Sequence, residues 1–497
     1  MSSADRFPHR AFVRLVALAA VLLPSLGSAD PWLAPGDALM RHDLQLLADA
    51  GVLRGPITSW PLPWPDVARD VLDAERTAKL GGAERAAMLR VQRAARSAMR
   101  TGEFIASGRI AGSNQPDILR GFAATAREDG ELGAALEWMG QRVAFRGQVT
   151  AVGGPDDHKR FRLDGTYLGV TLGNFMISAG FQERWWGPGW DGSLILSTSA
   201  RPAPAITIER NYSDAFDLPV LEWLGPWRAG IVFGQLEDER ADFDEARYFA
   251  ARVTFKPWRH LEIGLSRSAQ WCGDSRPCGF DTFSDLLLGK DNDDAPELQP
   301  GNQLAGYDVR LSSPWRSVPL VFYGQLIGED EAGGLPSKFL GLAGLEFAGA
   351  LGTGSYRATL EHADTSCSFS HSEPEFDCAY ESSIYTVGYR YRGRSLGHPA
   401  DNDARVTSLG LLYVAPDDTH WELKVRDAEL NRDADLPESG NTLAPVAIDL
   451  LAADVMHRRA LFDGFLKAGL GAERRRTVTT GEEETDWRVT AEWLGYF

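Results

Sequence analysis

The sequence predicts an all-β transmembrane antiparallel barrel of about 18 strands, preceded by a small α-helical module. Three observations predict this fold. Apolar and polar residues alternate in short segments through residues 102–497, the connections between segments are short at one end and long at the other, and the last alternating segment ends on Phe497.

The alternating segments have the two faces of membrane-spanning strands. In 421–426 (WELKVR), one face carries Trp, Leu and Val, and the other carries Glu, Lys and Arg. The same pattern recurs at 142–150, 247–255 and 385–392. A soluble sandwich or propeller also alternates, but whole charged side chains on the polar face favour a wet lumen, and aromatic residues gather at segment ends like interfacial girdles.

The connections between segments differ at the two ends. Pro-Trp-Arg recurs at 226–228, 257–259 and 314–316, each time between two alternating runs. Proline suits a tight turn and tryptophan suits a membrane interface. The opposite connections are long and acidic, at 272–303, 328–338, 364–381, 394–403 and 427–443. This asymmetry is typical of the periplasmic turns and extracellular loops of outer-membrane barrels.

The final segment, 486–497 (DWRVTAEWLGYF), alternates and ends on Phe497. A last strand with an aromatic C-terminal residue resembles the assembly signal of bacterial outer-membrane barrels. We therefore expect the barrel-assembly machinery to be a partner during biogenesis.

Residues 1–29 have the pattern of a cleaved secretory signal peptide. Arg6, Arg10 and Arg14 precede a short apolar run, and small residues lead to Ala29. The run is too short to span a membrane as a helix. Removal of three Arg and one Asp changes the formal charge from −18 to −20. This acidity argues against nucleic acid as a partner.

Residues 30–101 are expected to form the helical module. Apolar residues follow helical spacing in 37–53, with Asp37 as N-cap and Gly51 as the stop. Four prolines in 55–65 prevent that helix from continuing. Two further helices are predicted at 66–80 and 82–100.

The four cysteines fall into two close pairs, Cys272 with Cys278 and Cys367 with Cys378. In an oxidising compartment, two local disulfides are the natural assignment. The spacings do not fit a zinc site. We expect each disulfide to staple a loop.

Catalytic and metal-binding patterns are missing from the sequence. There is no G-x-S-x-G elbow, H-E-x-x-H helix or P-loop, and the nine histidines are scattered. Acidic residues at 291–297 and 401–403 could collect Ca²⁺, but neither run fits an EF-hand. We therefore expect that the protein is not an enzyme and that it holds neither a cofactor nor a metal ion.

The segment 184–202 (RWWGPGWDGSLILSTSARP) is the strongest candidate site. Its Gly and Pro residues impose tight backbone geometry. Two interpretations remain open: a binding or catalytic site, or a rigid piece of scaffold. The candidate residues are Arg184, Trp185, Trp186, Trp190, Asp191 and Arg201.

At 185–208 and at 46–67 (LLADAGVLRGPITSWPLPWPDV), the sequence resembles the capsule-assembly Wzi family of Gram-negative outer membranes. With the signal peptide, the helices and Phe497, the resemblance extends over essentially the whole chain. It implies a large barrel at 102–497 whose periplasmic end is associated with the helical module. It also implies a non-enzymatic, cofactor-free, lectin-like protein that attaches capsular polysaccharide or exopolysaccharide to the cell surface.

The expected location is thus the outer membrane, with loops outside the cell, and with outer-membrane lipid and lipopolysaccharide as further partners. The six candidate residues would either contact sugar or constrict the lumen, where Arg184, Asp191 and Arg201 would pair with lumenal charges. Two other functions stay open. A diffusion channel or substrate-specific porin would also have a charged interior, and a barrel enzyme would be a lipase or deacylase.

Overall fold

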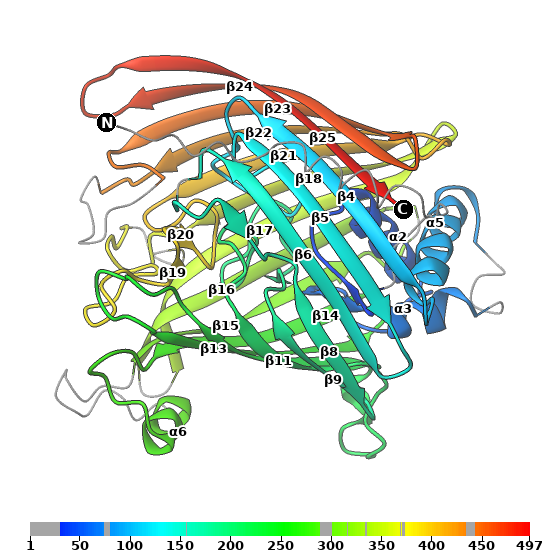
Figure 1. The fold of residues 1–497 in the computed structure, drawn as a ribbon, viewed down its shortest axis with the longest axis horizontal. Coiled ribbons are helices and arrows are strands. Elements are labelled where there is room, and N and C mark those ends of the chain that lie inside the picture. Colours follow the sequence, from blue (N-terminus) through cyan, green and yellow to red (C-terminus); the bar gives the residue numbers. More distant parts are fainter. Residues whose placement is uncertain are drawn as a thin grey trace, which may run out of the picture.

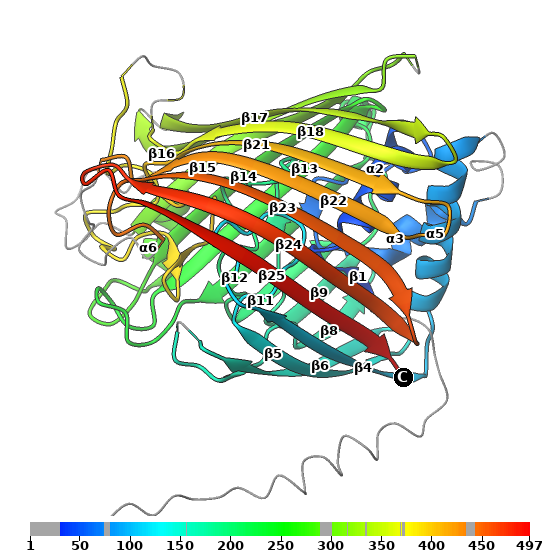
Figure 2. The same ribbon diagram turned by 90° about the horizontal axis from the view of Figure 1, so that it is seen from above.

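The computed structural model describes residues 30–73, 80–155, 157–288, 301–315, 317–332, 335–367, 369, 373–433 and 443–497. Long antiparallel strands form a closed barrel, with three helices at one end and the C-terminus at that same end (Figures 1 and 2). The wall strands are β4 (Phe104–Ser113), β5 (Gly130–Met139), β6 (Val143–Gly153), β7 (Phe161–Arg162), β8 (Tyr167–Leu172), β9 (Phe175–Gly180), β11 (Ala205–Arg210), β12 (Trp227–Gln235), β13 (Arg247–Trp258), β14 (Leu261–Trp271), β15 (Gly301–Ser312), β16 (Leu320–Ala332), β17 (Leu335–Leu351), β18 (Gly354–Asp364), β21 (Arg405–Val414), β22 (His420–Leu430), β23 (Ile448–Leu461), β24 (Gly464–Thr477) and β25 (Glu483–Tyr496).

The remaining elements lie inside the barrel, at its ends or in the connections. They are β1 (Trp32–Leu33), α2 (Ala38–Asp49), β2 (Ser59–Trp60), β3 (Leu62–Pro63), α3 (Trp64–Val71), α5 (Gly82–Ala98), β10 (Trp185–Trp186), the 3-10 helix η2 (Glu222–Leu224), α6 (Phe280–Leu288), β19 (Arg390–Tyr391) and β20 (Arg394–Ser395). Among the described residues, no helix is both long enough and apolar enough to cross a membrane.

The barrel closes between its last and first strands. β25 pairs antiparallel with β4, with Trp493 opposite Ile110. β7 and β8 both pair with β6 and share one position in the wall, with a change of register between them. With that position counted once, the described residues form 18 strands, so the predicted number is confirmed.

The two faces of the wall differ as the alternation predicts. In β25 the Trp487 side chain is 72% exposed on the outside, whereas the neighbouring Arg488 is buried. The segments predicted at 142–150, 247–255 and 421–426 lie in β6, β13 and β22. Their polar faces point into the lumen, where Arg252 and Arg426 are each 2% exposed. A lumen lined with charge needs internal partners, because burial of an unpaired charge is costly.

Two sequence predictions about connections are wrong. Residues 385–392 do not form a wall strand, because they lie in the connection from β18 to β21 and fold into the barrel. The hydroxyl of Tyr385 donates to the carbonyl of Cys272, at 2.9 Å, which ties the connection to the end of β14. The segment 328–338 is not a loop, because β16 and β17 continue into it as far as Ala332 and Leu335.

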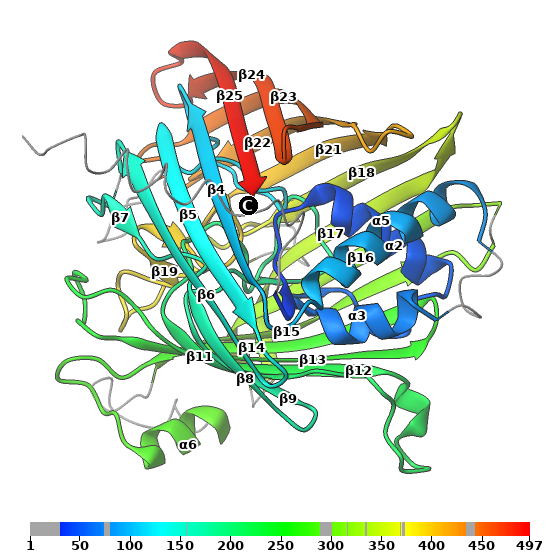
Figure 3. The ribbon, with the colours of Figure 1, turned by 45° about the vertical axis from the view of Figure 1, so that its right-hand side comes forward.

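The N-terminal helices lie at the barrel end that carries the short turns (Figure 3). Asp37 caps α2, as predicted, and accepts from the backbone N–H of Met40 at 3.0 Å. α3 starts at Trp64 rather than at residue 66, because Pro65 fits the first helical turn, where no N–H is required. The predicted helix 66–80 extends into 74–79, which lies outside the described residues.

Both predicted disulfides are present, Cys272–Cys278 and Cys367–Cys378. The first precedes α6, and the second lies within the connection from β18 to β21. The signal peptide prediction at 1–29, Arg316 of the third Pro-Trp-Arg turn and the acidic run 291–297 lie outside the described residues.

Candidate functional site

The motif 184–202 crosses the inside of the barrel. Its first residues form β10, which pairs antiparallel with β2, with Trp185 opposite Trp60 and Trp186 opposite Ser59. The side chains of Trp185 and Trp186 are 0% and 2% exposed. The motif is therefore fixed to the N-terminal segment by backbone pairing inside the lumen.

An aromatic cluster occupies the side of the motif that faces α2. The rings of Trp185 and Phe122 meet edge to face, with 5.5 Å between their centroids. The guanidinium of Arg41 lies over the rings of Phe122 and Trp190, at 4.3 and 4.4 Å, and donates to the carbonyl of Pro188. These ring faces are occupied by protein groups.

The connection from β18 to β21 covers the other side of the motif. The hydroxyl of Tyr380 donates to the carbonyl of Leu194 at 2.8 Å, and that of Tyr389 donates to the carbonyl of Ile195 at 3.0 Å. All four residues are buried. The tyrosines thus satisfy backbone carbonyls that the motif would otherwise leave without partners.

Four segments fill the lumen together, and we call their described residues the plug. The segment between β4 and β5 joins the others through the backbone, because Phe122 N–H donates to Trp190 and Ala124 N–H donates to Gly36. The plug comprises residues 30–65, 114–129, 181–204 and 365–404.

One wall carboxylate binds the turn at the centre of the motif. Glu361 of β18 accepts hydrogen bonds from the backbone N–H groups of Trp190, Asp191 and Gly192, at 2.7, 3.1 and 2.7 Å. It also accepts from the hydroxyl of Tyr323 at 2.7 Å. Four hydrogen bonds to one buried side chain thus fix the turn to the wall.

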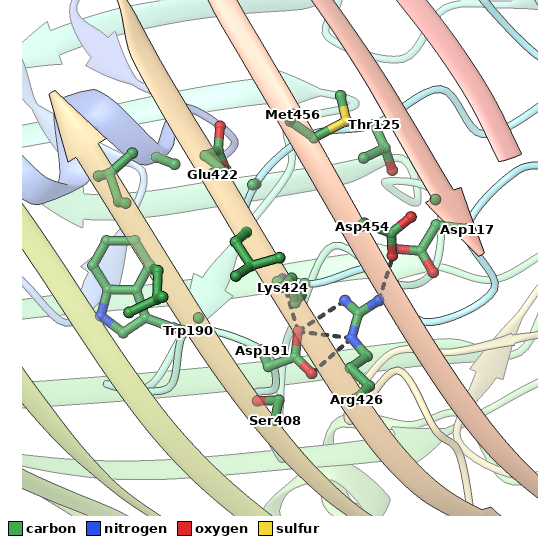
Figure 4. A pocket seen from close by; sticks show the side chains of 18 of the residues that line it. Asp117, Thr125, Trp190, Asp191, Ser408, Glu422, Lys424, Arg426, Asp454 and Met456 are labelled. Atoms are coloured by element: carbon green, nitrogen blue, oxygen red, sulfur yellow. Dashed lines mark hydrogen bonds and ion pairs between the residues drawn. The ribbon is translucent and has the colours of Figure 1, made fainter. Parts of the chain in front are cut away.

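Asp191 anchors the same turn to β22, which only β21 separates from β18 in the wall (Figure 4). Its carboxylate accepts from Arg426 at 2.8 and 2.9 Å and from Lys424 at 2.8 Å, both on β22. Burial alone would raise the pKa of Asp191, but the two cations hold it well below its ordinary value. The turn therefore carries a stable negative charge that fixes it to this side of the wall.

Similar bonds join the plug to most of the wall. Each places a charged or amide side chain of a strand against a backbone group, an indole N–H or an opposite charge of the plug. They join Glu209 to Trp32, Arg458 to Asp37, Arg310 to Asp49, Arg228 to Pro56, Glu262 to Ile57 and Thr58, Lys467 to Ala124, and Gln325 to Trp186 and Leu194.

A cavity of about 90 Å³ remains between the plug and strands β18 and β21–β25. Asp191, Lys424 and Arg426 line it together with Asp117 and Trp190 (Figure 4). Ligand sites of small molecules usually measure about 300–1,000 Å³, so this space suits water rather than a chain of sugars.

The remaining candidate residues lie apart from this turn. Arg201 pairs with Asp164 at 2.8 Å and also with Asp157, in the connection between β6 and β8. Arg184 donates to the carbonyl of Gln182 and to the hydroxyl of Thr207 on β11. The structure thus brings five of the six candidates around one crossing of the lumen and places Arg201 beside a different connection.

Sequence reasoning missed the wall residues that hold the motif. Glu361, Gln325 and Glu262 are single polar residues, each on the lumenal face of a different strand. The one available signal in the sequence was their position on the polar face of a strand. A large polar residue at such an inward position must find a hydrogen-bond partner inside the barrel.

Among the residues that the structure describes, no group of three or more His, Cys, Asp or Glu side chains is placed to hold a metal. The acidic run 401–403 is buried, and Asp401 pairs with Arg390 at 2.8 Å. The carboxylate of Asp401 is therefore already paired with a cationic side chain of the protein.

A closed antiparallel barrel with an apolar outside and a filled, charged lumen defines a class, the plugged outer-membrane β-barrels. Within that class the chain belongs to the Wzi family: the model of this family, "Capsule assembly protein Wzi", matches residues 101–487. The family indicated by the two sequence motifs is confirmed.

Two relatives are similar over much of the chain. A structure of Wzi from Escherichia coli, described as an outer membrane protein involved in group 1 capsule assembly and as a carbohydrate binding β-barrel, has 28% identity and a TM-score of 0.81, covering 93% of this chain and 98% of that one. An uncharacterized 55.8 kDa protein in the cps region of Klebsiella pneumoniae is 33% identical over 336 residues, which are 67% of this chain. The match spans 65% of that relative's length.

We expect Asp191→Asn to release the central turn from β22, because Arg426 and Lys424 lose the carboxylate that they share. Removal of one partner of a buried ion pair costs about 3–5 kcal/mol. Hydrogen exchange of the amides in 190–197 should accelerate strongly while the barrel stays folded. Asp449→Asn, which removes the exposed pair with Arg476, is the control and should change little. Equal exchange in the two variants would contradict the role of Asp191.

The connection from β18 to β21 should loosen as the pH rises. Burial raises the pKa of Asp403 from 3.8 to about 7, and the nearby carboxylates of Asp377 and Glu381 add to the shift. The folded state thus binds this proton more tightly than the unfolded state, so its contribution to stability is lost between about pH 4 and pH 7. Amides in 379–391 should exchange faster at pH 8 than at pH 5.5, after correction for intrinsic rates. The variant Asp403→Asn should lack this difference. An unchanged pH dependence in that variant would show that another group causes it.

Proposed function

We propose that this protein binds capsular polysaccharide or exopolysaccharide, attaches it to the surface of a Gram-negative bacterium and so helps to assemble the capsule layer. Membership of the Wzi family and the likeness to the E. coli carbohydrate-binding barrel support this function. The observation that carries it is the plug, because a lumen crossed by four segments leaves the ends of the barrel as the accessible surfaces.

The proposed orientation follows from the asymmetry of the two ends. The helical module comprises residues 30–101 after a signal peptide at 1–29, and the barrel comprises 102–497. Residues 30–65 of the module lie in the plug, and its later helices face the periplasm together with the short turns. The long connections then face outward and offer the polymer a surface that the two disulfides stiffen. Outer-membrane lipid and lipopolysaccharide surround the apolar wall, and the barrel-assembly machinery recognises the strand that ends at Phe497.

Within this proposal the motif 184–202 constricts the lumen and does not contact sugar. The faces of Trp185 and Trp186 are covered by protein, and Asp191 is engaged by two cations of the wall. Sugar recognition by aromatic stacking requires an accessible ring face. The function needs neither catalysis nor a cofactor, and we propose that the protein is not an enzyme.

Deletion of the protein should release polymer into the medium without stopping its synthesis. The measurement is the ratio of cell-bound to free polysaccharide, with total polysaccharide as the control. The same purified protein should show little single-channel conductance in planar bilayers. Steady conductance with unchanged polymer retention would support a diffusion channel or substrate-specific porin instead.

The double variant Trp185→Ala, Trp186→Ala should impair folding before it impairs binding. Truncating buried aromatic side chains costs about 3–5 kcal/mol each, so heat-modifiable migration on gels should be lost or weakened. Polymer pull-down by the fraction that still folds should be close to that of the parent protein. Normal migration together with lost pull-down would instead assign sugar contact to the motif.

A further inference from the structure

The connection between β11 and β12 exposes large apolar side chains at the barrel end that carries the helices. Leu218, Val220 and Trp223 are 57%, 80% and 68% exposed. Soluble surfaces rarely group such residues without a partner. The apolar residues lie within 214–224, a segment that we call the apolar projection.

The apolar projection is ordered by its own contacts. The rings of Phe216 and Trp227 stack with 4.5 Å between centroids, and Asp214 pairs with Arg69 of α3 at 2.9 Å. At its end, Gly225 has φ 68°, and a side chain there would meet the carbonyl of Lys256 at 2.2 Å. The segment is thus a defined turn, not a free chain, and it presents its apolar side chains outward.

The direction of the projection points to lipid. In Figure 3 the connection before β12 extends away from the wall at the side of the barrel, not across its mouth. The flanking strands carry Ile206 and Ile231 on the lipid-facing outside, where they are 55% and 37% exposed. The neighbouring turns add Trp258 and Trp315, 46% and 69% exposed. The projection therefore continues the apolar band of the wall beyond the ends of the strands.

We propose that the apolar projection is an interfacial anchor, which inserts Leu218, Val220 and Trp223 into the membrane leaflet at the helical end of the barrel. Asp217 and Glu222 lie among these residues and are exposed, and they would remain at the water side. The acidic charge disfavours attraction to anionic lipid headgroups, so insertion depends on burying apolar surface and is insensitive to salt. This inference does not depend on the identity of the polysaccharide.

A single introduced cysteine can test the anchor, because all four natural cysteines are in disulfides. The variant Val220→Cys is labelled with an environment-sensitive fluorophore, and the full chain is reconstituted into phosphatidylcholine nanodiscs, with or without brominated acyl chains. The matched control is Arg85→Cys, at an exposed position on α5. Bromolipid should quench the probe at 220 at least threefold more than the probe at 85, and aqueous iodide should show the reverse order, at both low and high salt.

Several outcomes would overturn the proposal. One is that iodide quenches both probes equally and bromolipid quenches neither. Another is that the probe at 220 is water-exposed in nanodiscs and becomes shielded only when a periplasmic extract is added, which would indicate a protein partner. Heat-modifiable migration checks that each variant is folded, and Leu218→Cys serves as a second reporter if Val220→Cys fails that check.

Discussion

The structure depends on the neutralisation of buried charge inside a closed barrel. Strands with an apolar outside can turn their polar residues only toward the lumen, and there the plug replaces water as their partner. Glu361 illustrates the solution, because one carboxylate receives three consecutive backbone N–H groups that no helix or strand would satisfy. Asp191 is the reverse case, because here a carboxylate of the plug pairs with Lys424 and Arg426 of the wall. Wall and plug thus complete each other's hydrogen bonds.

This dependence has consequences for folding. The plug is assembled from segments that lie far apart in the sequence, such as Arg41, Phe122 and Trp190, which meet in one aromatic cluster. Contacts of such long sequence separation are slow to form, since each requires closure of a long loop. The wall pairs mostly neighbouring strands and can form locally, whereas the plug needs both the wall and the other three segments. The plug is therefore the part of the molecule least able to exist alone.

Most of the wall could be predicted from the sequence, because the period-two pattern of a strand such as β22 reports directly which face meets lipid. The same rule failed at 385–392. Tyr385, Tyr389 and Tyr391 alternate as a strand would, but their hydroxyls are polar enough to be used inside, where those of Tyr385 and Tyr389 bond to backbone carbonyls. For the motif 184–202, the rigid Gly-Pro steps could be recognised in the sequence. Its partners could not, since Glu361 and Arg426 are distant in the chain and each resembles any other inward charge.

The bonds between plug and wall also have a mechanical meaning. A polymer held by the outer connections would transmit drag from flowing medium to the protein, and a simple loop would concentrate that force at its two ends. Here the connection from β18 to β21 is bonded through Tyr380 to the motif, which Glu361, Gln325 and Arg426 join to three different strands. Traction on one connection would thereby be divided among several hydrogen-bonded strands that are loaded in parallel, which lowers the force on each strand.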